Sequence, residues 1–177
     1  INDLSETFEK VSLILERSSE LKEIAPFILQ ELGTRLNCRW GTYWKVFPDS
    51  RELRALVTWT GAGFEATALK RDTKDRALSL SEGTAGHVWR SKKPIWTLDL
   101  LSDMCIPRSL DANTVGLKGG IWFPLKSDGT AHAVIELLGR NILAPTEELV
   151  VGIEEFGIHL GSLMSLNWPQ QYCSWSC

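Results

Sequence analysis

Two residues with reactive or charged side chains lie in a polar segment that joins two strand-like runs. Cys105 and Arg108 belong to this segment, which must cross over the sheet that the flanking strands form. Large aromatic side chains with an N–H group suit a pocket for a planar or amphipathic ligand. We therefore expect a small-molecule pocket lined by Trp59, Trp96 and Trp122 together with Cys105 and Arg108. In this pocket Arg108 meets either an anionic group of the ligand or solvent, because one arginine in a loop favours neither.

The histidines do not have the spacing of a metal site. His87, His132 and His159 are far apart in the sequence, so their spacing does not indicate that they bind a common metal ion. His132 is expected on a strand and is a candidate pocket residue, although a partly exposed or hydrogen-bonded histidine is the more common case. The sequence therefore predicts no metal, and it requires no cofactor, whose identity stays unknown.

The cysteines also lack a recognisable framework. Cys38, Cys173 and Cys177 could together hold zinc or an iron–sulfur cluster, but their spacing matches none of the common sites. The glycine-rich phosphate loop, the nucleophile elbow and the H-E-x-x-H motif are absent from the sequence. We therefore expect a domain with no catalytic residues.

The composition indicates one globular domain that binds neither nucleic acid nor membrane. The chain has 177 residues, of which 44% are hydrophobic and 23% charged, and its formal net charge is −3 without a basic cluster. No apolar run approaches the roughly 20 residues that span a bilayer, and the first residues are polar rather than a signal peptide. These features favour a cytoplasmic protein, and the start at Ile1 suggests a fragment of a longer chain.

Hydrophobic periodicity predicts helices at both ends and strands between them. Apolar residues recur at helical spacing in 2–17, from Ser18–Ser19 to Leu36 and in 144–166, whereas alternation with period two predicts strands from residue 40. A loop is expected over 64–75 and a short helix over 83–92. Further strands are expected over 77–80, over 94–100 and on both sides of the turn Ser127–Thr130. The expected divisions are a linker or dimerisation helix (1–19), the domain (20–166) and a tail (167–177).

Strands joined by tight turns favour an antiparallel sheet in an α+β fold. The terminal helices would cover one face of this sheet and the crossing segments the other. Thr146, followed by two glutamates, is the expected cap of the last helix.

Three short motifs, in this order and spacing, resemble the GAF domain family. They are Gly83-Thr-Ala-Gly86 at the start of the short helix, Val115-Gly-Leu117 ahead of Trp122-Phe-Pro-Leu125, and Val134-Ile-Glu-Leu137 in the last strand. The resemblance covers roughly residues 21–164 and is greatest to sensory GAF domains of bacterial, cyanobacterial-type two-component sensor histidine kinases.

This resemblance implies a six-stranded antiparallel sheet with a ligand pocket beneath the crossing segments. It also implies a sensory module that binds a small molecule, forms a homodimer through its terminal helices and signals to neighbouring domains. The apolar stripes of the terminal helices fit such a dimer, but they fit equally well a helical layer that only covers the sheet.

Other members of the family suggest alternatives. A bilin bound through Cys105, or haem bound through His132 or His87, would make the domain a tetrapyrrole sensor, although Cys105 is followed by Ile106 rather than by histidine. Free methionine sulfoxide reductases use several cysteines around the pocket, and here only Cys105 is placed to serve. The element typical of cyclic-nucleotide binding is absent after the last strand. A ligand-free dimerisation module is the remaining possibility.

Overall fold

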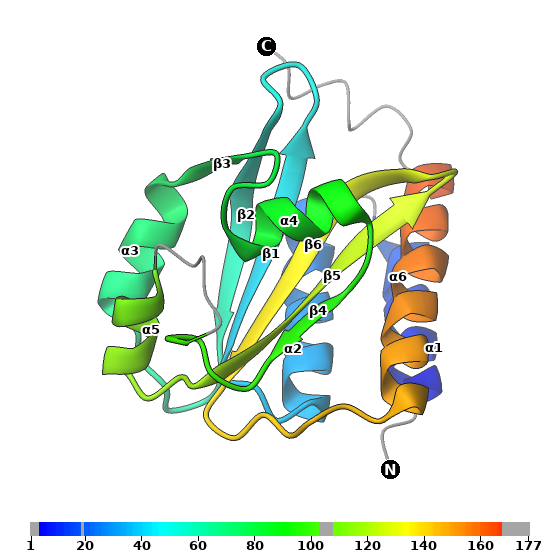
Figure 1. Cartoon of the computed structure of the whole chain (residues 1–177). Helices are drawn as coiled ribbons and strands as arrows, with labels where there is room; N and C mark the ends of the chain where they lie inside the picture. Colours follow the sequence, from blue (N-terminus) through cyan, green and yellow to red (C-terminus); the bar gives the residue numbers. More distant parts are fainter. Residues whose placement is uncertain (1–3, 19, 103–107, 168–177) are drawn as a thin grey trace.

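A six-stranded antiparallel sheet forms the centre of the protein, which we describe from a computed structural model for residues 4–18, 20–102 and 108–167 (Figure 1). The strands lie in the order β3-β2-β1-β6-β5-β4. They are β1 (Trp40–Phe47), β2 (Glu52–Thr60), β3 (Ala77–Ser79), β4 (Ile95–Thr97), β5 (Gly119–Ser127) and β6 (Thr130–Gly139). The helices are α1 (Ser5–Arg17), α2 (Leu21–Arg35), α3 (Thr67–Asp75), α4 (Gly83–Ser91), α5 (Ser109–Thr114) and α6 (Glu147–Asn167). The α+β class and the antiparallel sheet expected from the sequence are confirmed.

The long helices α2 and α6 cover one face of the sheet, and α1 packs against both of them (Figure 1). Val11 of α1, Leu29 of α2 and Ile153 of α6 are fully buried in the core on this face. The apolar stripe of α1 therefore packs within the domain. Thr146 caps α6 as predicted, since its Oγ1 accepts a hydrogen bond of 3.2 Å from the backbone N–H of Leu149. None of the helices in the described ranges is long and apolar enough to cross a membrane.

Helix α6 lies unusually close to β5 because it has glycines on the contact side. A β-carbon at Gly157 would meet the carbonyl oxygen of Pro124, and one at Gly161 would meet the backbone of Lys126. Without side chains at these two positions, the helix can rest directly on the strand.

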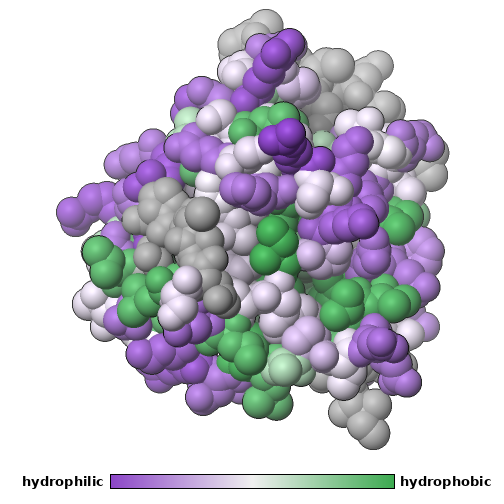
Figure 2. All heavy atoms as spheres, viewed as in Figure 1, coloured by the Kyte–Doolittle hydropathy of each residue, from purple (hydrophilic) through white to green (hydrophobic). Residues whose placement is uncertain are grey.

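The three short helices α3, α4 and α5 lie on the opposite face (Figure 1). Their core contains large aromatic side chains from the sheet, among them the buried Trp40, Trp44 and Trp122. Figure 2 shows that the outer surface on this side is mixed, with apolar patches separated by polar side chains. The helical layer on one face and crossing segments on the other agree with the expected arrangement.

Two sequence predictions on this face need correction. The expected loop over 64–75 contains α3, whose charged sequence hides a narrow apolar side: only Leu69 and Thr73, four residues apart, are buried. The strand expected over 94–100 is shorter, because β4 ends at Thr97. The crossing segment also contains the short helix α5, which the sequence analysis did not predict.

The β5–β6 hairpin forms where the Ser127–Thr130 turn predicted it. Asp128 and Gly129 have φ angles of 51° and 75°, as a two-residue turn of type I′ requires. This turn brings the last two long strands side by side in the middle of the sheet, where they position the polar residues described next.

Candidate functional site

A buried carboxylate, Glu136, lies at the centre of the face beneath the short helices. In the sheet Glu136 is paired with Thr42 of β1 and with Trp122 of β5. Directly paired residues of antiparallel strands point to the same face, so these side chains form a row across three strands. The indole Nε1 of Trp122 donates to Glu136 over 2.8 Å, and the hydroxyl of Thr42 donates over 2.9 Å. Trp40 Nε1 donates to Thr42 Oγ1 at 2.9 Å and to Glu136 at 3.3 Å.

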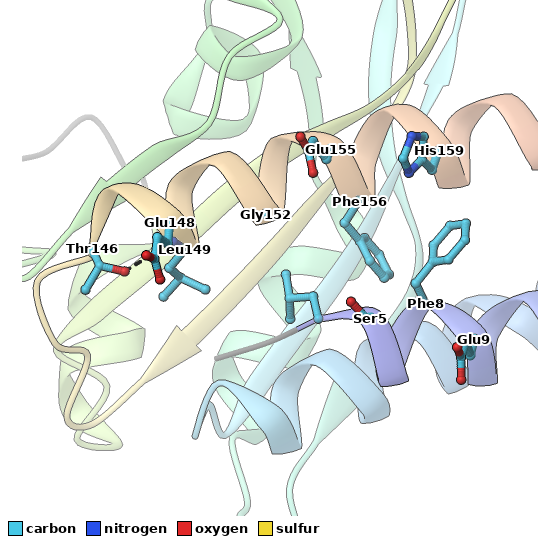
Figure 3. A pocket seen from close by; sticks show the side chains of 11 residues that line it. Ser5, Phe8, Glu9, Thr146, Glu148, Leu149, Gly152, Glu155, Phe156 and His159 are labelled. Carbon is cyan, nitrogen blue, oxygen red and sulfur yellow. Dashed lines mark hydrogen bonds between the residues drawn. The ribbon is translucent and has the colours of Figure 1, made fainter. Parts of the chain in front are cut away.

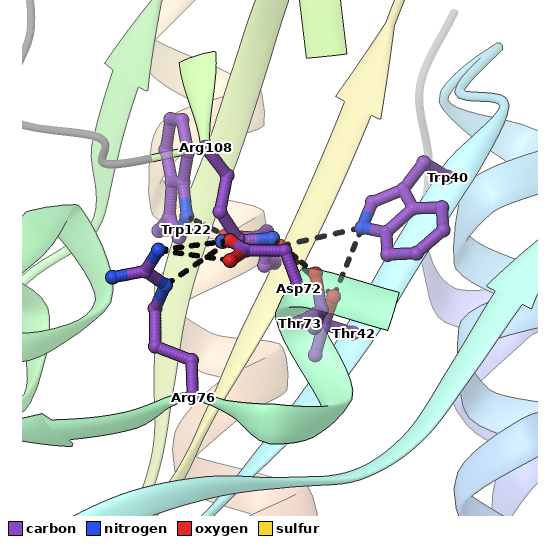
Figure 4. Close-up of polar contacts among 8 residues, drawn as sticks. Trp40, Thr42, Asp72, Thr73, Arg76, Arg108 and Trp122 are labelled. Carbon is purple, nitrogen blue, oxygen red and sulfur yellow. Dashed lines mark hydrogen bonds and ion pairs between the residues drawn. The ribbon is translucent and has the colours of Figure 1, made fainter. Parts of the chain in front are cut away.

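The charge of Glu136 is balanced by Arg108, which comes just before α5 (Figure 4). Arg108 Nη2 donates to Glu136 Oε2 over 2.6 Å, and Nη1 donates to the Thr73 hydroxyl of α3 over 2.8 Å. The guanidinium also lies over the ring of Trp44, 5.1 Å from its centroid. Only 3% of the Arg108 side chain and 1% of the Glu136 side chain are exposed. One arginine therefore connects α3, the start of α5, β1 and β6.

The surroundings keep Glu136 ionised. Burial by itself would raise the pKa of its carboxyl, but the Arg108 charge and the hydrogen bonds from Arg108, Trp122 and Thr42 outweigh burial and lower this pKa. An enclosed ion pair of this kind is balanced only while both partners are present, because removing one leaves an uncompensated buried charge.

Two buried N–H groups of this cluster have no hydrogen-bond acceptor among the described residues. They are Nε1 of Trp44 and Nε of Arg108, the two members of the cation–π stack. A buried donor without an acceptor costs about 1–3 kcal/mol, and native proteins leave few of them. Within the described residues, these two donors are the hydrogen-bonding capacity of the cluster that is left unused.

The structure brings together only some of the predicted pocket residues. Arg108 and Trp122 both contact Glu136, as described above. Cys105 lies outside the described residues, as do Cys173 and Cys177. His132 is half-buried and lies on β6, four residues or about 13 Å along the strand from Glu136. Burial lowers the pKa of its imidazole, and the charge of Asp128 acts against this.

Trp59 and Trp96 lie on the opposite face of the sheet, against the long helices. Trp59 is paired with Gly41, and its ring fills the space beside Gly33 of α2. Trp96 is paired with Ile121, and its Nε1 donates to the carbonyl of Leu143 over 3.2 Å. The expected cluster of Trp59, Trp96, Trp122 and Arg108 is therefore not formed, because the pairing register places the first two on the other side.

Several members of the site were not predicted from the sequence. They are Glu136, Thr42, Thr73, Trp40 and Trp44. A signal existed for Glu136, which is the one charged residue inside the apolar run Ala133–Leu138. Glutamate in the middle of a buried strand is rarely found without a partner of opposite charge.

Thiol and metal chemistry have little basis in the described part of the chain. Cys38 is the one cysteine within it, and burial on the long-helix side raises the pKa of its thiol to about 12. Such a thiol is almost entirely protonated at neutral pH and is a poor nucleophile. Across the described ranges, histidine, cysteine and acidic side chains form no group of three or more that could bind a metal ion.

A groove lies between the long helices α1 and α6, away from the Arg108–Glu136 cluster (Figure 3). This groove has a volume of about 660 Å³ between the start of α1 and α6. Leu4, Phe8 and Phe156 contribute apolar surface, and Phe8 lies edge-on to Phe156 with ring centroids 6.1 Å apart. Glu9, Glu148 and Glu155 also line it. The groove therefore lies between two helices of the same domain, along the apolar stripes of α1 and α6.

Comparison with known proteins identifies the family. The profile described as the GAF domain matches residues 18–165, so the chain belongs to the GAF domain family. A sequence search of functionally characterised proteins finds no match.

Solved structures with this fold include signalling proteins and enzymes. The GAF domain of a phosphoenolpyruvate-protein phosphotransferase from Coxiella burnetii superimposes with a TM-score of 0.74 at 13% identity, covering 96% of both chains. A free methionine-R-sulfoxide reductase from Neisseria meningitidis, in complex with its substrate, gives 0.70 at 13% identity, covering 93% of this chain and 89% of that one. A fragment of a methyl-accepting chemotaxis protein gives 0.66 at 13% identity, with 90% and 97% covered. At these identities the shared property is the fold.

Proposed function

We propose that this GAF domain is a non-catalytic sensory module of a bacterial signal-transduction protein. It binds a small molecule at the face that carries the Arg108–Glu136 pair. The observation that carries this proposal is a pair of buried donors, Trp44 Nε1 and Arg108 Nε, which lack acceptors in the described part of the chain and lie beside a fully bonded carboxylate. The parent protein is cytoplasmic in this proposal, and a sensor histidine kinase is the output that we favour.

Adjacent residues of β5 and β6 connect the ligand-site face of the sheet with the face that carries the long helices. In β6, Glu136 faces the ligand site while its neighbours Ile135 and Leu137 pack against the long helices. In β5, Trp122 likewise lies on the ligand-site face, and Phe123 packs against the long helices. A shift of these strands would move α6 as well, because α6 packs directly on β5. The ligand transmits a signal only if it binds more tightly to one arrangement of the helices than to another.

We test ligand binding by native mass spectrometry of the protein purified from a bacterial host, followed by identification of any released molecule. The wild-type protein is expected to carry an additional mass that is lost when Arg108→Met is combined with Glu136→Leu, so that no unpaired charge stays buried. Arg90→Met is the matched control, because Arg90 lies on α4 but its Nη1 hydrogen bond to Ser81 is on the exposed surface. If neither host extracts nor metabolite mixtures add mass to the wild type, small-molecule sensing is refuted and the ligand-free dimerisation module is favoured.

The homodimer is proposed through α1 and α6. Leu13 of α1 and Val151 of α6 are each 52% exposed, and Ile158 is one heptad further along α6 at 39%. We expect Leu13→Glu combined with Ile158→Glu to convert the dimer to a monomer in sedimentation velocity experiments. Leu110→Glu, on the exposed side of α5, is the control and should leave the dimer intact. A wild-type protein that sediments as a monomer at all concentrations would contradict this proposal.

Two alternatives have distinct signatures. A tetrapyrrole sensor, with Cys105 or His132 as the anchor, would show a visible absorption band when expressed with haem or bilin. A free methionine-R-sulfoxide reductase, suggested by the fold of the Neisseria enzyme, would consume the sulfoxide in the presence of a dithiol reductant. The buried Cys38 thiol, whose pKa is raised to about 12, does not favour the reductase.

A further inference from the structure

The hydrogen-bonding capacity left over in the Arg108–Glu136 cluster defines a class of ligand. The carboxylate of Glu136 already accepts hydrogen bonds from Trp40, Thr42, Arg108 and Trp122. A ligand that donates hydrogen bonds would therefore compete with partners that are in place. The unused groups, Trp44 Nε1 and Arg108 Nε, are both donors. Only a ligand that accepts hydrogen bonds gains from them.

The charges of the cluster restrict the ligand further. Arg108 and Glu136 neutralise each other at 2.6 Å within a site that excludes solvent. An anionic ligand would bring a second negative charge to one buried guanidinium, and a cationic ligand would add a second positive charge beside it. Either ion would lose its hydration without a free partner of opposite charge, which is costly in a low-dielectric site. A neutral ligand avoids this cost.

Apolar side chains surround the stack on the same face. Leu69 of α3 and Ala112 of α5 are buried in one cluster with Trp44, Trp122 and Leu117. If a ligand lies between the guanidinium and the indole ring, the part of the ligand that contacts neither group would contact these apolar side chains. The body of the ligand is therefore expected to be apolar, since polar groups there would find few partners.

We infer that the site selects an uncharged, largely apolar molecule that presents a carbonyl-type oxygen to Trp44 Nε1 and Arg108 Nε. This inference rests on the proposed function, because it assigns the chemical class of the ligand to the same site. Both nitrogen atoms are enclosed, so the packing around Arg108 and Trp44 must open for the oxygen to enter. Binding thus adds an acceptor for each of the two donors.

Four probes of similar shape test this class: acetophenone, ethylbenzene, benzoate and benzylammonium. Only acetophenone combines neutrality with a carbonyl acceptor. Each is titrated into ¹⁵N-labelled protein, and the indole N–H signals of Trp44, Trp40 and Trp122 and the Nε–H signal of Arg108 are followed. We expect acetophenone to move the Trp44 and Arg108 signals downfield. The Trp40 and Trp122 signals, whose N–H groups already have acceptors, are expected to move less.

Variants separate hydrogen bonding from simple filling of apolar space. Trp44→Phe, which assigns the Trp44 signal, should weaken acetophenone binding about two- to tenfold, the loss of one hydrogen bond, and leave ethylbenzene binding unchanged. Trp59→Phe, on the opposite face, is the matched control and should change neither. Equal affinity for acetophenone and ethylbenzene, tighter binding of either ion, or no response to any probe would overturn the inference.

Failure of this inference is distinguishable from failure of the proposed function. If native mass spectrometry finds a bound molecule whose addition leaves the Trp44 and Arg108 signals unchanged, the domain is a sensor but the assigned ligand class is wrong. A bound molecule that carries a net charge leads to the same result. If no molecule binds by either method, both proposals are refuted.

Discussion

On one face of the sheet the long helices bury aliphatic and aromatic side chains, whereas on the other the short helices enclose an ion pair among tryptophans. The same strands build both faces, because successive residues point in opposite directions. Ile135 and Leu137 belong to the apolar face, and Glu136 between them belongs to the polar one. Apolar contacts are non-directional and tolerate small losses, but a buried polar network is stabilising only while its partners are present. The apolar face thus suits stability, and the polar face suits a response to a ligand.

The largest expected effect comes from removing one charge of the polar face. Glu136→Leu leaves the Arg108 guanidinium buried and unpaired, which should lower the free energy of unfolding by about 3–5 kcal/mol in urea titrations. Adding Arg108→Met to this variant should recover much of the loss, because two apolar side chains then replace the pair. If the double variant is less stable than the single one, the comparison between the faces is wrong.

The two kinds of indole on the polar face provide a narrower test. Trp122→Phe removes a hydrogen bond to the ionised Glu136, whereas Trp44→Phe removes a donor that has no acceptor. Both changes leave a cavity of similar size. We therefore expect Trp122→Phe to be less stable than Trp44→Phe by about 1.5–3 kcal/mol in urea unfolding. Equal stabilities would mean that both indoles have equivalent partners in solution.

On the apolar face, close packing rather than pairing should determine the response. Gly157→Ala would force its new methyl group against the Pro124 carbonyl and should destabilise the protein by about 1–3 kcal/mol. Gly152→Ala in the same helix is the control, because a β-carbon there meets only Leu4 Cδ1 at 3.8 Å. Removing a helix-interior glycine should instead stabilise the protein by up to about 1 kcal/mol. Thermal unfolding with opposite shifts of the midpoint would support this difference.

The smallest expected effect is a dependence on pH that comes from the polar face. The folded state lowers the pKa of Glu136, so the carboxyl of the unfolded chain binds a proton first as the pH falls below about 4.3. The stabilisation by the ionised carboxylate is complete above that pH and is lost as the pH falls toward the lower pKa of the folded state. The stability difference between the wild type and Glu136→Gln should therefore narrow in acid. A difference that stays constant between about pH 7 and pH 3.5 would contradict this assignment.

Much of the fold could be predicted because it depends on local patterns. Three sequence signals each act on structure only a few residues away. They are the change of hydrophobic period near Trp40, which marks β1, the Asp128–Gly129 turn of the hairpin, and the Thr146 cap of α6. Helix α3 was missed because its short buried side is surrounded by charged residues. The face of the sheet on which each tryptophan lies could not be predicted from its neighbours in the sequence. It depends on which residue of a neighbouring strand each one is paired with, as the pairs Trp59–Gly41 and Trp122–Glu136 show.

The candidate site was predicted only in part for the same reason. Arg108 was recognised, but its partner was expected to be a ligand or solvent, and Glu136 was not considered. The bond from Arg108 to Thr73 joins positions 35 residues apart, in a helix that the sequence did not indicate. Contacts of this kind follow from the packing of whole elements, which no short motif records.

The bond between Thr42 and Glu136 has a consequence for how the protein is made. These residues are 94 positions apart, on the first strand and the last. During synthesis the tryptophans and Arg108 leave the ribosome before the carboxylate that organises them. The site can close only after β6 has paired with β1, so it is assembled in the final stage of folding. A chain halted before β6 would carry nearly all of the side chains of the site without forming it, and ligand binding would therefore report that the entire sheet is complete.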